Sequence, residues 1–226
     1  MSIPLYIGFD DREAIAYHVF CQSVIEHASE TIEINPLASN MLNGFDGQRD
    51  GTNAFIYSRF LIPALRDFGG WAIFCDGDML CQADIAELWN LRDDRYAVMV
   101  VKHNYKTKAK LKYIGTSMES PNQDYPGKNQ SSVILWNCSH PANRVLTPDR
   151  VATESGSWLH RFSWLTPEQI GEIPITWNWL VNEYPPNISA KLLHYTLGVP
   201  AIPHYADKDH AQEWSQATQR MMRCGY

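Results

Sequence analysis

Two aspartates separated by one glycine stand directly after a short apolar run. The run is WAIFC, residues 71–75, and Asp76 and Asp78 follow it with Gly77 between them. Ligands of open α/β sheets bind outside the carboxyl ends of the strands, and two acids buried there without a partner are costly. Carboxylate oxygens suit Mg²⁺ or Mn²⁺, and Gly77 allows the tight turn that lets both side chains reach one ion. The pattern predicts a metal site, although many ordinary turns also contain Asp and Gly.

The elements that must position these acids alternate between apolar runs and helical periodicity. Strands are predicted at residues 3–9, 31–37, 71–75, 96–101, 132–136 and 191–195. Helices are predicted at residues 12–27, 54–68, 84–88 and 207–223. Residues 38–53 are predicted to be a loop, and residues 102–129 are a long polar connection. This alternation is typical of βα units and predicts a single α/β domain with helices flanking a mainly parallel central sheet.

Composition narrows the class of protein. The chain has 226 residues, 45% of them apolar, and a formal net charge of −6, so it suits one domain with a sizeable core. The acidic balance argues against a general nucleic-acid binder. No apolar run approaches the ~20 residues of a membrane span, and the absence of an export signal predicts a cytoplasmic protein. An odd number of widely spaced cysteines disfavours disulfides and zinc clusters. They are Cys21, Cys75, Cys81, Cys138 and Cys224.

Five segments, taken in order, resemble the nucleotide-sugar glycosyltransferases of the GT-A fold, and most closely the retaining bacterial enzymes of glycosyltransferase family eight. They are SRFLIPAL (58–65), WAIFCDGDMLCQADIAELW (71–89), NQSSVILWN (129–137), PITWNWL (174–180) and KLLHYTLGVP (191–200). Each segment alone is a weak signal. Their order matches that of the family, and the likeness extends from Asp10 to Pro200. The resemblance implies a Rossmann-like GT-A domain.

The resemblance also implies a complete set of metal ligands. In the family, both acids of the D-x-D motif and a distal histidine hold the metal on the donor's diphosphate, and Asp76, Asp78 and His194 match them. Two carboxylates and an imidazole leave room for phosphate oxygens in an octahedral shell. A lone histidine on an apolar strand is otherwise most often a core residue. Three other histidines lack such a context and are predicted to be structural or superficial: His103, His160 and His204.

Further family positions imply contacts to the nucleotide. Arg59 matches an arginine that contacts the nucleotide or its phosphate. Asp10 or Asp11 matches the acid after the first strand, which contacts the base or ribose, with Arg12 near by.

Two positions depart from the family pattern. Gln130 or Ser131 stands where the family has an asparagine that touches the donor sugar, which leaves the identity of the sugar open. Gly198 matches the family glycine near the C-terminus only approximately, and no lysine follows it in the usual place.

Other sets of residues keep two interpretations open. Trp177, Asn178 and Trp179 are either an acceptor platform or a tryptophan-rich core. A basic stretch interleaved with Tyr105 and Tyr113 is either a solvated loop or a lid over donor phosphates or an anionic acceptor. Its lysines are Lys102, Lys106, Lys108, Lys110 and Lys112.

The sequence therefore predicts metal-dependent transfer of a hexose from a nucleoside diphosphate sugar, expected to be a UDP-sugar, to an acceptor hydroxyl, with retention as the family implies. The nucleotide-binding half is placed at about 1–103 and the acceptor half at about 104–226. An inverting reaction would need a carboxylate base, and the sequence does not choose among Glu168, Glu172 and Glu183. One alternative is a phosphohydrolase of the haloacid dehalogenase type, although the residues after the second acid, Met79-Leu80-Cys81, do not match the pattern of those enzymes. A second alternative is a binding module that holds the nucleotide without turnover.

Overall fold

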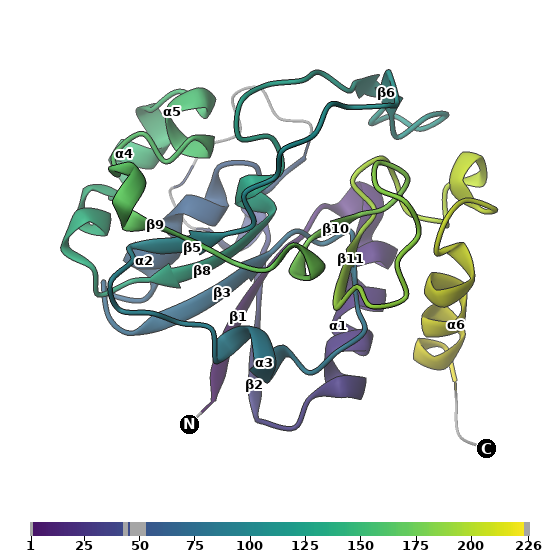
Figure 1. Ribbon diagram of the computed structural model, residues 1–226, viewed down its shortest axis with the longest axis horizontal. Coiled ribbons are helices and arrows are strands. Elements are labelled where there is room, and N and C mark those ends of the chain that lie inside the picture. Colours follow the sequence, from purple (N-terminus) through teal and green to yellow (C-terminus); the bar gives the residue numbers. More distant parts are fainter. Residues whose placement is uncertain (1, 43–44, 46–52, 224–226) are drawn as a thin grey trace.

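A six-stranded sheet forms the centre of the computed structural model, which describes residues 2–42, 45 and 53–223 (Figure 1). The spatial order of the strands is β2-β1-β3-β8-β5-β9. Their bounds are β1 (Ile3–Gly8), β2 (Ile32–Leu37), β3 (Trp71–Cys75), β5 (Val98–Val100), β8 (Val133–Asn137) and β9 (Ile170–Glu172).

The strands of this sheet run mainly in one direction. β1 is parallel to β2 and β3, and β5 is parallel to β9, whereas β8 is antiparallel to β3 and β5. Only β8 is thus reversed in the central sheet as described. The predicted mixed, mainly parallel α/β fold is confirmed.

The alternation of side chains along β1 divides the core into two layers. Ile3, Leu5 and Ile7 pack on one face against α1 and α3, while Tyr6 lies on the other face with the layer that includes α2, α4 and α5. α6 packs on the outer side of α1 (Figure 1). The helices are α1 (Ala14–His27), α2 (Ile62–Leu65), α3 (Ile85–Trp89), α4 (Pro148–Thr153), α5 (Gly156–His160) and α6 (Ala211–Met221).

One predicted helix is much shorter in the structure. The helix predicted at 54–68 is reduced to a 3₁₀ turn at Ser58–Leu61 followed by the single turn of α2, and it does not continue past Arg66 because Asp67 and Phe68, with φ of 49° and 53°, are left-handed. The loop predicted at 38–53 lies largely outside the described residues, as does Cys224. The four cysteines within the described part of the chain are free thiols. No helix there has the length and apolar character needed to cross a bilayer.

A second, three-stranded sheet lies beside the central one, in the order β10-β11-β4. It consists of β4 (Met79–Cys81), β10 (Trp179–Leu180) and β11 (Leu192–His194). β4 pairs with β11 antiparallel, which sets His194 opposite Met79. The chain therefore passes from the central sheet to the small sheet within the three residues that carry the predicted metal-binding acids.

The polar connection at 102–129 contains a hairpin of β6 (Leu111–Lys112) and β7 (Ser120–Pro121). Figure 1 shows this segment above the end of the central sheet where β1 and β3 finish. It therefore overhangs the edge of the sheet that carries residues 76–78, here called the acidic loop.

Candidate active site

The acidic loop is fixed by backbone hydrogen bonds to both sheets. The Asp76 amide donates to the Ser132 carbonyl at 2.9 Å, which extends the pairing of β3 with the β8 side of the central sheet. The Asp78 carbonyl accepts from the Tyr195 amide at 2.9 Å, directly after β11. The two carboxylates are thus held at the junction between the sheets, and both are buried.

Gly77 is needed for a reason other than the predicted turn. Its φ lies outside the left-handed region. A Cβ at this position would lie closer than 3.0 Å to the carbonyl oxygen of Gly8, at the end of β1. The glycine therefore allows the acidic loop to pack against β1 backbone, a close approach that no side chain permits.

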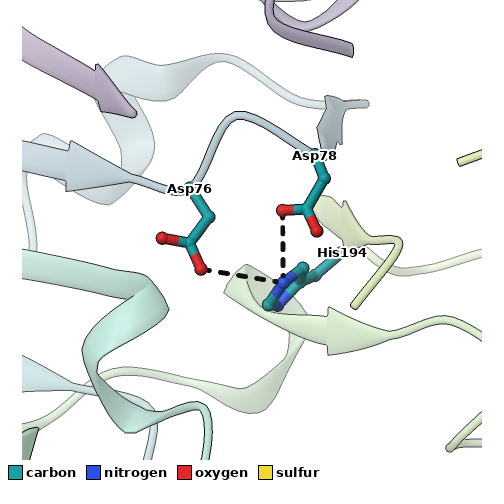
Figure 2. Close-up of side chains that lie close together, drawn as sticks. All are labelled: Asp76, Asp78 and His194. Atoms are coloured by element: carbon teal, nitrogen blue, oxygen red, sulfur yellow. Dashed lines mark ion pairs between the residues drawn. The ribbon is translucent and has the colours of Figure 1, made fainter. Parts of the chain in front are cut away.

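His194 meets the two acids from the small sheet (Figure 2). Its Nε2 lies 3.4 Å from Asp78 Oδ1 and 3.9 Å from Asp76 Oδ2. The three side chains each offer a ligand atom within 4.8 Å of the others. The structure therefore brings together the three residues that the sequence predicted as metal ligands, although 116 positions separate Asp78 from His194.

A buried amide sets the tautomer of this histidine. Asn178 Nδ2 donates to the Asn129 carbonyl at 3.0 Å, so Asn178 Oδ1 faces His194 at 2.9 Å and accepts a hydrogen bond from Nδ1. Nε2 is then the ring nitrogen that faces the carboxylates and is available to a metal ion. Metal-binding histidines are commonly oriented through their other ring nitrogen in this way.

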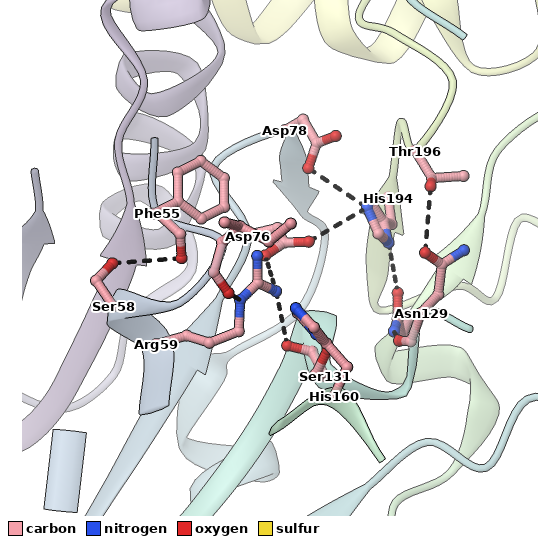
Figure 3. Close-up of polar contacts among 12 residues, drawn as sticks. Phe55, Ser58, Arg59, Asp76, Asp78, Asn129, Ser131, His160, His194 and Thr196 are labelled. Carbon is pink, nitrogen blue, oxygen red and sulfur yellow. Dashed lines mark hydrogen bonds and ion pairs between the residues drawn. The ribbon is translucent and has the colours of Figure 1, made fainter. Parts of the chain in front are cut away.

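Arg59 is paired with the first acid rather than extended into solvent (Figure 3). Its guanidinium lies 2.6 Å from Asp76 Oδ1 and donates to the Ser131 carbonyl at 2.9 Å. The rings of Phe55 and Phe74 flank it at 5.3 and 4.8 Å from their centroids. Arg59 therefore orients Asp76 in the structure, and its predicted contact to the nucleotide stays a prediction.

The environment shifts the two carboxyl pKa values in opposite directions. Burial raises the pKa of Asp76, although Arg59 acts against this change. Burial also disfavours the charge of Asp78, but the attraction of His194 and the hydrogen bonds it receives hold the pKa of Asp78 below its ordinary value. Asp78 is therefore the more firmly ionised of the two acids.

A cavity of about 540 Å³ opens onto this cluster. Five of the predicted site residues line it: Arg59, Asp76, Asp78, Ser131 and His194. Positive side chains from other segments also line it, namely Lys112, Lys128 and Arg161. Its volume is within the ordinary range for small-molecule sites.

The other residues predicted to contact the donor lie apart from the lining of this cavity. Asp10 is buried and accepts hydrogen bonds from Arg12 and from the Ala54 amide at 2.8 Å, while Asp11 is exposed. Gln130 belongs to the 3₁₀ turn that precedes β8. Their roles in binding the donor stay predictions.

A glycine is required at position 198 by the local backbone and packing. Its φ of 141° is unfavourable for other residues, and a Cβ there would lie closer than 3.0 Å to the ring of Tyr205. A role for Gly198 in binding the donor likewise stays a prediction.

Several residues with open interpretations now have definite surroundings. Trp177 is buried in the core, and neither it nor Trp179 lines the cavity. Glu168 and Glu172 are exposed, and neither lines the cavity. Glu183 is buried and hydrogen-bonded on both carboxylate oxygens.

His160 was predicted to be structural or superficial, yet it lines the cavity. Its Nδ1 lies 2.7 Å from Ser131 Oγ, and burial lowers its pKa to about 3, so the ring is neutral. Asn129, beside Gln130, also lines the cavity and supplies the carbonyl that orients Asn178. No spacing in the sequence singled out either residue.

Glu13 is a buried acid that the sequence analysis did not identify. Neither of its carboxylate oxygens has a hydrogen-bond partner among the described residues. Burial raises the pKa of Glu13 well above its usual value, and the negative charges of Asp78, Asp10 and Asp76 raise it further, while Lys112 acts the other way. Glu13 is therefore protonated in the folded chain at pH values where an exposed glutamate is ionised.

Glu13→Gln should stabilise the protein near neutral pH. The unfolded chain releases the Glu13 proton above about pH 4.5, whereas the folded chain retains it, so wild-type stability falls as pH rises through that window. Glutamine avoids this loss. We expect a melting temperature at least about 2–4 °C higher at pH 7, the shift that ~1 kcal/mol gives a chain of this size.

Thermal unfolding of the metal-free protein at pH 4.5 and pH 7 measures this difference. Glu30→Gln, at an exposed glutamate, serves as the control and should shift neither melting temperature. A Glu13→Gln gain that is equal at both pH values would contradict the raised pKa.

The central sheet, the acidic loop at its carboxyl edge and the facing histidine define a GT-A glycosyltransferase. Solved structures support this class at the level of the fold. The galactosyltransferase LgtC, in complex with donor and acceptor sugar analogues, has a TM-score of 0.54 at 13% identity, over 100% of this chain and 98% of that one. The glycosyltransferase GlyE of Streptococcus pneumoniae has a TM-score of 0.59 at 10% identity, over 96% of this chain and 60% of that one.

Sequence comparison identifies the family. The model of glycosyl transferase family 8 matches residues 11–137, more than half of the chain. Protein CDI of Arabidopsis thaliana is 41% identical over 221 residues, which cover 93% of this chain and 83% of the relative. The chain belongs to glycosyltransferase family 8, as the resemblance implied, and it is a glycosyltransferase.

Proposed function

We propose that this protein transfers a hexose from a nucleoside diphosphate sugar, expected to be a UDP-sugar, to an acceptor hydroxyl, in a reaction that depends on Mn²⁺ or Mg²⁺ and retains the anomeric configuration. The observation that supports this proposal most directly is the convergence of Asp76, Asp78 and His194 at one cavity.

The donor set suits such an ion. Two carboxylates and one imidazole nitrogen fit a divalent cation that keeps positions for phosphate oxygens. Arg59 holds Asp76, and Asn178 holds His194 with Nε2 directed toward the acids. When bound, the ion offsets the negative charge that develops on the departing diphosphate.

The surrounding residues position the reactants and limit access of water. The lining includes Tyr57, Tyr113 and Tyr125, which supply apolar surface beside the charged groups. Apolar surface beside the reacting groups excludes water when donor and acceptor are bound, which favours transfer over hydrolysis. In our proposal residues 1–103 bind mainly the nucleotide, and residues 104–226 supply the acceptor side.

Retention is supported by the distribution of carboxylates. Asp76 and Asp78 are the only acidic side chains among the described residues that line the cavity. An inverting transfer needs a carboxylate that deprotonates the acceptor, and Glu183, the buried candidate, has both oxygens engaged. A retaining transfer requires no such base, because the leaving phosphate can accept the proton.

Donor hydrolysis in the absence of acceptor tests the proposal. We expect slow release of nucleoside diphosphate from at least one member of a panel of nucleotide sugars with Mn²⁺, and loss of this turnover when a chelator removes the metal. Parallel assays measure phosphate release from simple phosphate esters, which should not occur. No turnover of any donor, or donor binding that never leads to turnover with any acceptor tried, would contradict the proposal.

A further inference from the structure

The basic stretch of the polar connection divides into two kinds of lysine. Lys102, Lys106, Lys108 and Lys110 are exposed, because the extended chain turns every second side chain to solvent. Lys112, at the end of β6, is half-buried and lines the cavity instead. Lys128, near the end of the same connection, also lines the cavity. Two of the connection's lysines thus face the same space as the acids.

Lys112 is a cation without a direct partner. Within the described part of the chain, no hydrogen bond or ion pair engages its Nζ, which lies 5.4 Å from the ring centroid of Tyr113. Burial lowers the pKa of Lys112, although the charges of Asp78 and Asp76 favour its protonation. A half-buried ammonium group that has lost hydration without gaining a counter-ion is suited to bind an anion.

Lys128 adds a second cation close to the first. Its Nζ donates to Asn122 Oδ1 at 2.5 Å and to the Gln123 carbonyl at 2.6 Å, and one ammonium proton is left for a ligand. Burial, followed by repulsion from Lys112, lowers the pKa of Lys128 to about 8. An anion between the two lysines would relieve this repulsion.

A buried network fixes the segment that carries these lysines. Glu183 Oε1 accepts from Asn122 Nδ2 at 2.9 Å, and Glu183 Oε2 accepts from the Lys108 amide at 2.7 Å. Asn122 in turn holds Lys128. Glu183 follows β10, whose neighbour β11 carries His194. The lysines and the histidine are therefore positioned by the same small sheet.

A second contact ties Lys112 to the acids. The amide of Tyr113 donates to the Leu197 carbonyl at 2.6 Å, and its hydroxyl donates to Asp78 at 3.4 Å. The connection thus reaches the acidic loop directly. The two lysines and the predicted metal site therefore line one cavity.

We propose that Lys112 and Lys128 bind the phosphate groups of the donor's nucleoside diphosphate, and that Glu183, through Asn122, is the positioning residue for this anion site. This inference rests on the proposed function. A diphosphate suits the arrangement because some of its oxygens can contact a metal ion held by the acids while others contact the lysines. An anionic acceptor is the competing ligand of the same chemistry.

Binding measurements on the full chain test the lysine site. Isothermal titration calorimetry with Mn²⁺ compares uridine diphosphate and guanosine diphosphate with uridine and guanosine. For the diphosphate that the wild type binds, Lys112→Met should weaken affinity by roughly ten- to hundred-fold, the effect of one lost charge-assisted contact. Affinity for the nucleoside should not change. Lys128→Met should behave alike, and Lys112→Arg should retain part of the affinity.

Lys110→Met is the matched control, since Lys110 is exposed on the same segment two positions away. It should bind like the wild type. The inference would be overturned if Lys112→Met and Lys128→Met bound the diphosphate as tightly as the wild type. It would also be overturned if these variants changed only the KM for an anionic acceptor. If the wild type binds no nucleoside diphosphate with Mn²⁺, the proposed function itself fails.

Glu183→Gln separates positioning from direct contact. The variant should weaken diphosphate binding in the wild-type background but add little to Lys128→Met, because both changes act through the same cation. Full additivity of the two losses would contradict a positioning role. Direct titration with Mn²⁺ alone should give affinities for these variants no weaker than that of the wild type, which excludes an effect through the metal ligands.

Discussion

Asp78→Asn is expected to reduce glycosyl transfer by about 10²–10³-fold and to abolish the metal dependence of nucleotide binding. Asp78 is the acid whose pKa is lowered by His194 and by its hydrogen bonds, so it carries negative charge at neutral pH. An amide of the same shape keeps the packing and removes the charge. The loss is of the size seen when a preorganised electrostatic contact to the transition state is deleted. Turnover assays and calorimetry with and without Mn²⁺ measure it.

Asp207→Asn, at an exposed acid, is the control for this variant and should leave both turnover and binding unchanged. Circular dichroism should show that Asp78→Asn retains the fold. A folded Asp78→Asn protein with wild-type, metal-dependent affinity for nucleoside diphosphate would remove the metal role from this acid.

Gly77→Ala should damage stability and activity together. The new methyl group would meet the Gly8 carbonyl at less than 3.0 Å, and backbone cannot yield as a flexible side chain can. Overpacking of this kind costs about 1–3 kcal/mol, which corresponds to a melting temperature lower by roughly 2–12 °C for a chain of this size. The acidic loop must move away from β1, so both carboxylates shift relative to His194. Thermal unfolding and Mn²⁺ titration measure the two effects.

Gly69→Ala is the matched comparison, because Gly69 has no positive φ and a Cβ there meets nothing closer than 3.4 Å. It should change the melting temperature little and leave Mn²⁺ affinity intact. A Gly77→Ala protein with wild-type stability and wild-type Mn²⁺ affinity would show that the acidic loop does not depend on this close approach.

The central sheet could be predicted because its strands are continuous apolar runs. The predicted strands at 71–75 and 132–136 agree closely with β3 and β8. The reversed direction of β8 could not be predicted, since a strand buried on both faces has the same apolar pattern in either direction. β9 was missed because its residues Ile-Gly-Glu form no apolar run, and β4 was missed because only three residues separate it from the end of β3.

The site was predicted where residue type and family order coincide, as at Asp76, Asp78 and His194. The residues that orient them were less accessible. Asn178 was considered only as part of an aromatic platform, and nothing in its spacing indicates a hydrogen bond to His194. Lys112 was one of five similar lysines, all at even-numbered positions, and it differs from the exposed four because Leu111 is also exposed and the alternation shifts by one residue there. Such roles depend on tertiary contacts between distant segments.

The short ladder between β4 and β11 lies inside the core, although each strand has only three residues. Met79, Cys81 and Leu192 pack with the strands of the central sheet, and Leu80 and Leu193 pack with α1 and α6. Segments open at a lower free energy than the whole molecule when they have few buried apolar contacts, and this ladder is buried throughout. His194 should therefore stay beside Asp78 until the six-stranded sheet itself unfolds, so heating should abolish Mn²⁺ binding only at the temperature of global denaturation.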